Sequence, residues 1–146
     1  MSWQAFENEN PDLAAFGLAR FGSQVAYLAT VRKDGSPRVH PVTPIVGAGR
    51  LFLFMEPTSP KGHDLRRDGR YALHASVENS GGGSGEFWVT GRARFVEDAE
   101  TRAVAIESAS YEPAARYILF ELSVESAFSN VYQEDGPPIR QSWKQD

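Results

Sequence analysis

The chain of 146 residues lacks cysteine, and this absence excludes disulfides, thiol nucleophiles and thiolate metal sites. Its histidines, His40, His63 and His74, form neither a His-x-x-x-His nor a His-Glu-x-x-His pair, so the sequence gives little support for a zinc site. A Gly-x-Ser-x-Gly elbow is also missing, and the carboxylates are dispersed rather than paired. Hydrolysis by side chains alone is therefore disfavoured, and we expect a cofactor to supply any chemistry.

Two further absences restrict the partners and the location of the protein. The formal net charge is −4 and the pI is about 5.4, whereas a nucleic-acid-binding surface would favour a basic balance. No apolar run approaches the roughly 20 residues of a membrane span, and the first ten residues carry acids instead of the apolar segment of a signal peptide. We therefore expect a cytoplasmic protein that binds neither nucleic acid nor a membrane.

The composition itself is that of one folded domain. Hydrophobic residues make up 41% of the chain and charged residues 23%, which permits a sizeable core. The length suits a single domain over residues 1–146, and no internal repeat or linker divides it.

The pattern of apolar and turn residues predicts short strands and three helices, as in a small barrel with helical additions. Helices are expected to begin at residues 11, 60 and 99, each after a residue that can cap a helix: Asn10, Ser59 and Asp98. Strands are expected over residues 25–31, 37–46, 51–55, 71–77, 87–96 and 117–124, followed by 127–132 and an extended tail over 136–143.

Two prolines and a glycine-rich loop mark irregular points along this pattern. Pro41 and Pro44 remove ladder donors, so the strand over 37–46 should be an edge strand or bulged. Residues 78–85 read as a flexible hairpin tip, because Glu86 stands where a dinucleotide fingerprint would need its third glycine.

The segment Ser59-Pro60-Lys61 combines three features of an anion site. Ser59 can cap a helix, Pro60 suits the first helical position, and the free N–H groups of that turn attract negative charge. Lys61 adds a full positive charge to the same turn, so a phosphate is the expected ligand. Arg38 can be a second phosphate ligand, and it shares a strand face with His40 and Val42.

The ordered set of motifs resembles the pyridoxamine phosphate oxidase-like, flavin-binding split-barrel superfamily. The resemblance is carried by the order in which the motifs follow one another between residues 25 and 96: Tyr27-Leu-Ala-Thr-Val31, Asp34-Gly-Ser-Pro-Arg-Val39, Arg50-Leu-Phe-Leu-Phe54, Ser59-Pro-Lys61, Leu65-Arg-Arg-Asp68 and Val89-Thr-Gly-Arg-Ala93. It implies a mainly β fold with α additions. The expected architecture is a Greek-key-like, six-stranded split β-barrel that forms a homodimer, with flavin mononucleotide (FMN) in two grooves at the subunit interface.

The resemblance also assigns residues to the cofactor. The FMN-lining strand corresponds to Arg38, Val39, His40, Pro41, Val42 and Thr43, with Phe54 and Met55 beside the flavin and Ser59, Pro60 and Lys61 at the phosphate. Glu86 corresponds to a residue that reaches the cofactor from the partner subunit. Tyr132 and Arg140 fall where the family places an aromatic and a basic residue near the ring and the substrate.

Departures from the oxidase pattern make pyridoxamine phosphate an unsuitable substrate. Pro60 replaces an arginine, Glu86 replaces a glutamine, and Arg140-Gln-Ser142 lacks the histidine of the substrate motif. We therefore expect an FMN-dependent oxidoreductase whose small-molecule substrate and electron donor are unassigned. The alternatives are a deazaflavin-dependent reductase and a non-catalytic flavin- or haem-binding protein, in which His40, His63 or His74 would be the axial ligand.

Overall fold

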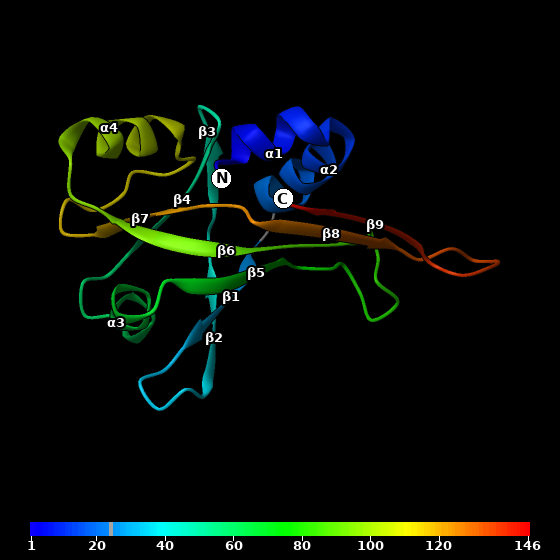
Figure 1. The fold of residues 1–146 in the computed structure, drawn as a ribbon, viewed down its shortest axis with the longest axis horizontal. Coiled ribbons are helices and arrows are strands. Elements are labelled where there is room, and N and C mark those ends of the chain that lie inside the picture. Colours follow the sequence, from blue (N-terminus) through cyan, green and yellow to red (C-terminus); the bar gives the residue numbers. More distant parts are fainter. Residues whose placement is uncertain (24) are drawn as a thin grey trace.

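The fold is a curled antiparallel β-sheet with helices at its margins, and the computed structural model describes it for residues 1–23 and 25–146 (Figure 1). Over these residues the helices are α1 (Trp3–Glu9), α2 (Pro11–Ser23), α3 (Pro60–Arg67) and α4 (Ala99–Ser108). The strands are β1 (Ala26–Val31), β2 (Pro37–Val42), β3 (Ile45–Gly47), β4 (Arg50–Met55), β5 (Arg70–Ala75), β6 (Glu86–Val96), β7 (Ile118–Leu122), β8 (Ser126–Val131) and β9 (Ile139–Lys144).

Strand β6 is the centre of the sheet and makes it curl. Its residues 88–92 pair with β5, while on its other side residues 86–90 pair with β8 and residues 93–96 pair with β7. Gly91 lies where β6 passes from one partner to the next, and a Cβ atom there would lie 2.1 Å from the Ser123 carbonyl oxygen. The strand order β2-β1-β5-β6-β7-β4-β3, with β9 beyond β8, confirms the expected split-barrel architecture.

The described sheet has nine strands, more than the expected six, because one predicted strand is divided and the two segments after β7 pair as β8 and β9. The strand expected over 37–46 stops at Val42, and β3 begins at Ile45 and pairs with β4 instead of β1. Pro44 lacks the N–H that would continue the ladder, so the chain changes partner there. The expected edge position is confirmed, since β2 pairs with β1 alone among the described strands. The tail forms β9 on β8.

Helix α1 was not expected from the sequence, yet it supplies the largest buried side chain. The Ser2 hydroxyl accepts a hydrogen bond from the Ala5 N–H and caps this helix. Trp3 and Phe6 are fully buried, and the Trp3 ring lies 6.3 Å from the ring of Phe87 in β6. The N-terminal segment therefore forms part of the main hydrophobic core.

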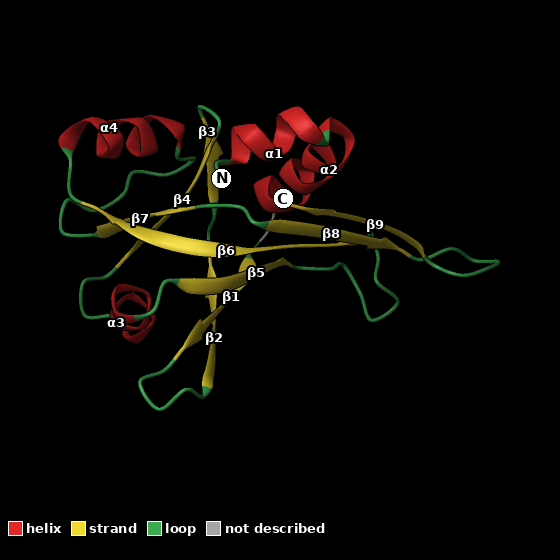
Figure 2. Cartoon of the chain, in the orientation of Figure 1, coloured by secondary structure: helices red, strands yellow, loops and turns green. Residues whose placement is uncertain are grey.

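The helices lie on two sides of the central strand. Figure 2 shows α1, α2 and α4 on one side of β6 and α3 on the other.

Trp143 Nε1 donates to Glu9 Oε2 at 2.7 Å, so the end of the chain lies against its beginning. None of the helices in the described residues combines the length and apolar character needed to cross a bilayer.

Candidate functional site

Helix α3 begins where the sequence predicts, but the hydrogen bonds of its first turn differ from those expected. Ser59 occupies the N-cap position and Pro60 follows it, as expected. The Ser59 hydroxyl makes no capping bond, which corrects the prediction, and accepts instead from Lys61 Nζ at 2.9 Å. The N–H groups of Gly62 and His63 already bond to the Ser59 carbonyl oxygen, at 3.0 and 3.2 Å. The hydroxyl is therefore free to position the ammonium of Lys61.

Lys61 is a cation without a countercharge. Burial lowers its pKa from the ordinary value. No carboxylate of the described residues lies within ion-pair distance of its ammonium. A half-buried ammonium of this kind gains from an anionic ligand, because the ligand supplies the missing negative charge.

The buried carboxylate of Asp64 organises the cations around the same helix. It accepts from Arg38 Nε at 2.7 Å, Thr30 Oγ1 at 2.8 Å and Arg67 Nη2 at 3.0 Å. Burial alone would raise the pKa of Asp64, but these three donors together hold it below its ordinary value. Arg38, expected to meet a phosphate, is thus anchored through Nε by Asp64.

A groove of about 640 Å³ opens beside this cluster. Its lining includes Arg38 from β2, with Pro60, His63, Asp64 and Arg67 from α3, and we call it the phosphate groove. A guanidinium fork matches phosphate oxygens, and the helix dipole favours an anion at the start of α3, although the N–H groups of Gly62 and His63 are already bonded. These residues therefore fit a phosphate group, with Lys61 and Ser59 at the same helix start. The sequence did not indicate a role for Asp64 in the site, because only the fold brings its carboxylate into contact with Arg38.

The remaining residues expected to lie along the flavin differ in exposure. On β2, Val39 is 66% exposed and Pro41 is exposed as well, whereas His40 is half-buried and Val42 is buried. Thr43, just after the strand, is exposed.

Phe54 and Met55 of β4 are core residues in this chain. Phe54 packs in a cluster with Phe52 and Leu119, and Met55 belongs to the main core. Neither side chain is among the residues that line the phosphate groove.

A second group of predicted residues gathers at the other end of β6. Glu86 accepts from Tyr132 OH and from Asn130 Nδ2, both at 3.2 Å. Arg140 of β9 lies directly opposite Asn130 of β8 in the strand register. Asn130 was missed by the sequence analysis, and its Oδ1 is buried without a donor among the described residues. Glu86, Tyr132 and Arg140 thus form one polar cluster with Asn130.

The two groups are far apart within one chain. Ala93 of β6 lies beside the segment that follows α3, where its N–H donates to the Gly69 carbonyl oxygen at 2.7 Å. Ala93 lies seven positions along the strand from Glu86, a span of about 23 Å at the usual rise of a strand. Figure 1 shows α3 beside the far end of β6 from Glu86.

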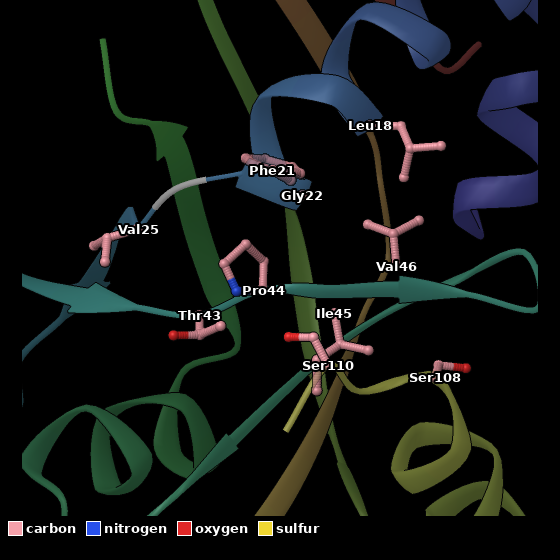
Figure 3. A pocket seen from close by; sticks show the side chains of 10 residues that line it. All are labelled: Leu18, Phe21, Gly22, Val25, Thr43, Pro44, Ile45, Val46, Ser108 and Ser110. Carbon is pink, nitrogen blue, oxygen red and sulfur yellow. The ribbon is translucent and has the colours of Figure 1, made fainter. Parts of the chain in front are cut away.

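A second hollow, of about 400 Å³, has a different character (Figure 3). It lies between α2, the segment from Thr43 to Val46, and the end of α4, and Leu18 lies opposite Val46 across it. No charged side chain is among its lining residues, and Thr43 is the one predicted site residue there. This hollow does not suit a phosphate. The described residues also contain no group of three or more metal-ligating side chains.

The curled antiparallel sheet with peripheral helices defines a split-barrel protein. Residues 16–133 match the model of the pyridoxamine 5'-phosphate oxidase family, and the chain therefore belongs to that family. No curated protein matches the sequence.

Several solved structures share the fold. A haem binding protein from Mycobacterium smegmatis is 22% identical with a TM-score of 0.67, over 89% of this chain but only 57% of that one. PhzG from Burkholderia lata, in complex with tetrahydrophenazine-1-carboxylic acid, is 17% identical with a TM-score of 0.68, over 98% and 87%. A NimC/NimA family protein from Clostridium acetobutylicum is 17% identical with a TM-score of 0.64, over 87% and 90%. At these identities the likeness is one of fold.

Proposed function

We propose that the protein is an FMN-dependent oxidoreductase that works as a homodimer. The observation that carries this proposal is the phosphate groove in a chain of the pyridoxamine 5'-phosphate oxidase family. Beside it lies the half-buried ammonium of Lys61, whose hydrogen-bond partner is the uncharged hydroxyl of Ser59. The groove opens beside β2, the strand that the family resemblance assigns to the flavin. FMN, when bound, supplies hydride or electron transfer at its ring.

The roles of the protein side chains follow from their contacts. Lys61 and Arg38 neutralise the phosphate, and Ser59 holds the ammonium of Lys61 in place. Asp64 keeps Arg38 at the groove while its own charge is balanced by Arg38 and Arg67. The exposed edge of β2 then provides backbone groups and the Pro41 side chain for a flat ring.

The homodimer is supported by the separation of the two groups of predicted residues. Lys61 and Glu86 lie at opposite ends of β6, so one chain alone does not place both against one small cofactor. A two-fold axis through the outer face of the sheet would bring the Glu86 end of one copy to the Lys61 end of the other. Each dimer would then hold two equivalent sites.

The outer face of the sheet has a shape that suits such packing. One row of directly opposed residues is large, and it runs across five strands: Pro41, Tyr27, His74, Trp88 and Phe128. The neighbouring row is mostly small: Val39, Ala29, Ala72, Thr90 and Ser126. The Trp88 ring stacks between His74 and Phe128, with centroids 5.4 and 5.2 Å away. We infer that the aromatic row of one copy packs into the small row of the other.

The substrate is not expected to be pyridoxamine phosphate. That substrate would need the histidine missing from Arg140-Gln-Ser142. The polar cluster around Glu86 instead offers an acid, an amide and a phenol hydroxyl near Arg140. Because the cluster contains both hydrogen-bond donors and acceptors, it suits a small polar substrate.

Haem binding is the second candidate, and one observation favours it. His74 Nδ1 lies 2.7 Å from the Ala75 carbonyl oxygen, so this nitrogen carries the proton and donates. The other ring nitrogen is then a lone-pair donor, the arrangement that iron-ligating histidines use. Of the three histidines proposed as ligands, His74 is thus the one with a fixed tautomer.

The visible spectrum of the purified protein, followed by anaerobic addition of a reduced nicotinamide dinucleotide, tests the proposal. A flavin spectrum that is bleached by the donor supports the oxidoreductase. A flavin spectrum that this donor does not bleach supports a binding protein. A Soret band that His74→Ala abolishes supports haem and contradicts the FMN proposal.

A further inference from the structure

A hollow adjoining the phosphate groove is lined by five cationic side chains. It has a volume of about 480 Å³ and lies between the β1–β2 turn, the end of α3 and the paired strands β5 and β6. We call it the basic groove and define it by its cations: Arg32, Lys33, Arg67, Arg70 and Arg92. The single acid in its lining is Asp68. A chain with a net charge of −4 has therefore gathered an excess of positive charge in one place.

Neighbouring carboxylates neutralise only part of this charge. Asp68 pairs with Arg70 at 2.7 Å, and hydrogen bonds from Arg70 lower the pKa of Asp68 to about 2. Arg92 has its ion-pair contact at 3.9 Å, with Glu125. Arg32 and Lys33 form no ion pair within the described part of the chain. Arg32 also lies near Asp34 and Arg92 near Asp68, and each helps to lower the pKa of that carboxyl. Lys33 is therefore the groove cation with no countercharge among the described residues, while Arg32 and Arg92 have only longer-range ones.

The pairing of β5 with β6 places two of these cations against each other. Arg70 and Arg92 lie directly opposite in the strand register. Like charges at opposed positions of an antiparallel pair destabilise a sheet. Asp68, which bonds Arg70 and also lies near Arg92, offsets part of this repulsion, and a bound anion would offset the rest.

We propose that the basic groove binds a multiply charged anion of the diphosphate or oligocarboxylate class. Arginine forks match the oxygens of both groups, and lysine adds a mobile charge. The basic groove and the phosphate groove share Arg32, Lys33 and Arg67 in their linings, so an extended ligand can run from one to the other. The proposal goes beyond the proposed function, because the basic groove does not require bound flavin.

Calorimetric titration with inorganic pyrophosphate at low salt tests this site. We expect one pyrophosphate per chain in the wild type and also in Lys61→Ala, which removes the cation of the first turn of α3. Lys33→Gln and Arg92→Gln should each weaken binding about fivefold or more, since one charge-assisted hydrogen bond is worth roughly tenfold and exposure reduces it. Lys144→Gln, which removes an exposed charge from the end of β9, is the matched control and should change affinity less than about twofold.

The outcomes separate this proposal from the proposed function. Loss of pyrophosphate binding in Lys61→Ala, or an equal effect of Lys144→Gln, would overturn the basic groove. Intact pyrophosphate binding in a protein that takes no FMN would overturn the proposed function and leave the groove standing. Tighter binding of ADP-ribose than of pyrophosphate would identify a dinucleotide as the source, and tighter binding of triglutamate would identify an oligocarboxylate tail. Both support the groove.

Discussion

At the scale of single residues, Lys61 is the side chain whose charge matters most for the cofactor. We predict that Lys61→Ala weakens FMN binding roughly ten- to a hundredfold, because a charge-assisted contact to phosphate is worth about 1.5–3 kcal/mol. The midpoint of thermal unfolding should hardly change, since Lys61 forms no ion pair in the described chain and its charge opposes the helix dipole. Titration of cofactor-free protein measures the effect, and Lys144→Ala is the control. Unchanged affinity would remove Lys61 from the site.

The buried carboxylate of Asp64 makes a prediction about pH. Because its pKa in the folded protein is lower than its unfolded value of about 3.9, its stabilisation is complete above that value. The stabilisation is lost as the pH falls through the lower folded pKa. Asp64→Asn should lower the free energy of unfolding by about 2–4 kcal/mol at pH 7 and by progressively less below pH 4.

Urea unfolding at several pH values measures this difference. The exposed Asp135→Asn is the control and should match the wild type throughout. A difference that stays constant down to pH 2 would show that Asp64 acts through packing instead of charge.

Glu86 is expected to influence the electron affinity of a bound flavin. If Glu86 reaches the partner's site, Glu86→Gln removes a negative charge and should raise the reduction potential and tighten binding. A charge about 10 Å away is worth about 1.7 kcal/mol at an effective dielectric constant of 20, or about 35 mV for a two-electron couple. Potentiometry of the FMN-loaded protein measures the shift, with the exposed Glu134→Gln as control. Equal potentials for both variants would place Glu86 outside the site.

At the scale of elements, the packing of α2 on the sheet depends on one glycine. A Cβ atom at Gly17 would lie 2.2 Å from the Phe87 ring, which is fully buried and cannot move away. Gly17→Ala should therefore destabilise the protein by about 1–3 kcal/mol despite the better helix propensity of alanine.

Gly22 provides the comparison within the same helix. A Cβ atom there meets nothing within 4 Å, so Gly22→Ala should be neutral or stabilise by up to about 1 kcal/mol. Denaturant unfolding of both variants tests the assignment of the α2 face. Equal effects at the two positions would contradict the described packing.

Local signals in the sequence predicted most helices and strands. They failed where contacts between distant residues decide whether a segment forms a helix. Helices α2, α3 and α4 begin where Pro11, Pro60 and Asp98 indicated. Helix α1 was missed because its seven residues gain stability mainly from burying Trp3 and Phe6, which a local pattern does not show.

The candidate site divides in the same way. The turn at Ser59 and Lys61 was readable because its residues are adjacent in the sequence. Asp64 and Asn130 were not, because their partners lie 26 and 44 residues away along the chain. Which residues share one groove is a property of strand order and of any second copy, and the family resemblance supplied those expectations.

At the scale of the whole molecule, we predict a dimer formed through the outer face of the sheet. Light scattering at micromolar concentration should give twice the chain mass of 16.1 kDa. Ala72→Arg places a long charged side chain in the small row and should give a folded monomer with weakened FMN binding. Ala103→Arg, at an exposed position of α4, should remain a dimer. A wild-type monomer, or a dimeric Ala72→Arg protein, would contradict this interface.

The most direct test of the account compares FMN with riboflavin in calorimetric titrations of cofactor-free protein. The two ligands share the flavin ring and differ in the phosphate, which Arg38 of the phosphate groove and the neighbouring Lys61 are proposed to hold. We predict one FMN per chain and riboflavin affinity at least about a hundredfold weaker, since two charge-assisted contacts are lost. Equal affinities, or no binding of FMN, would contradict the proposal that this protein anchors a flavin by its phosphate.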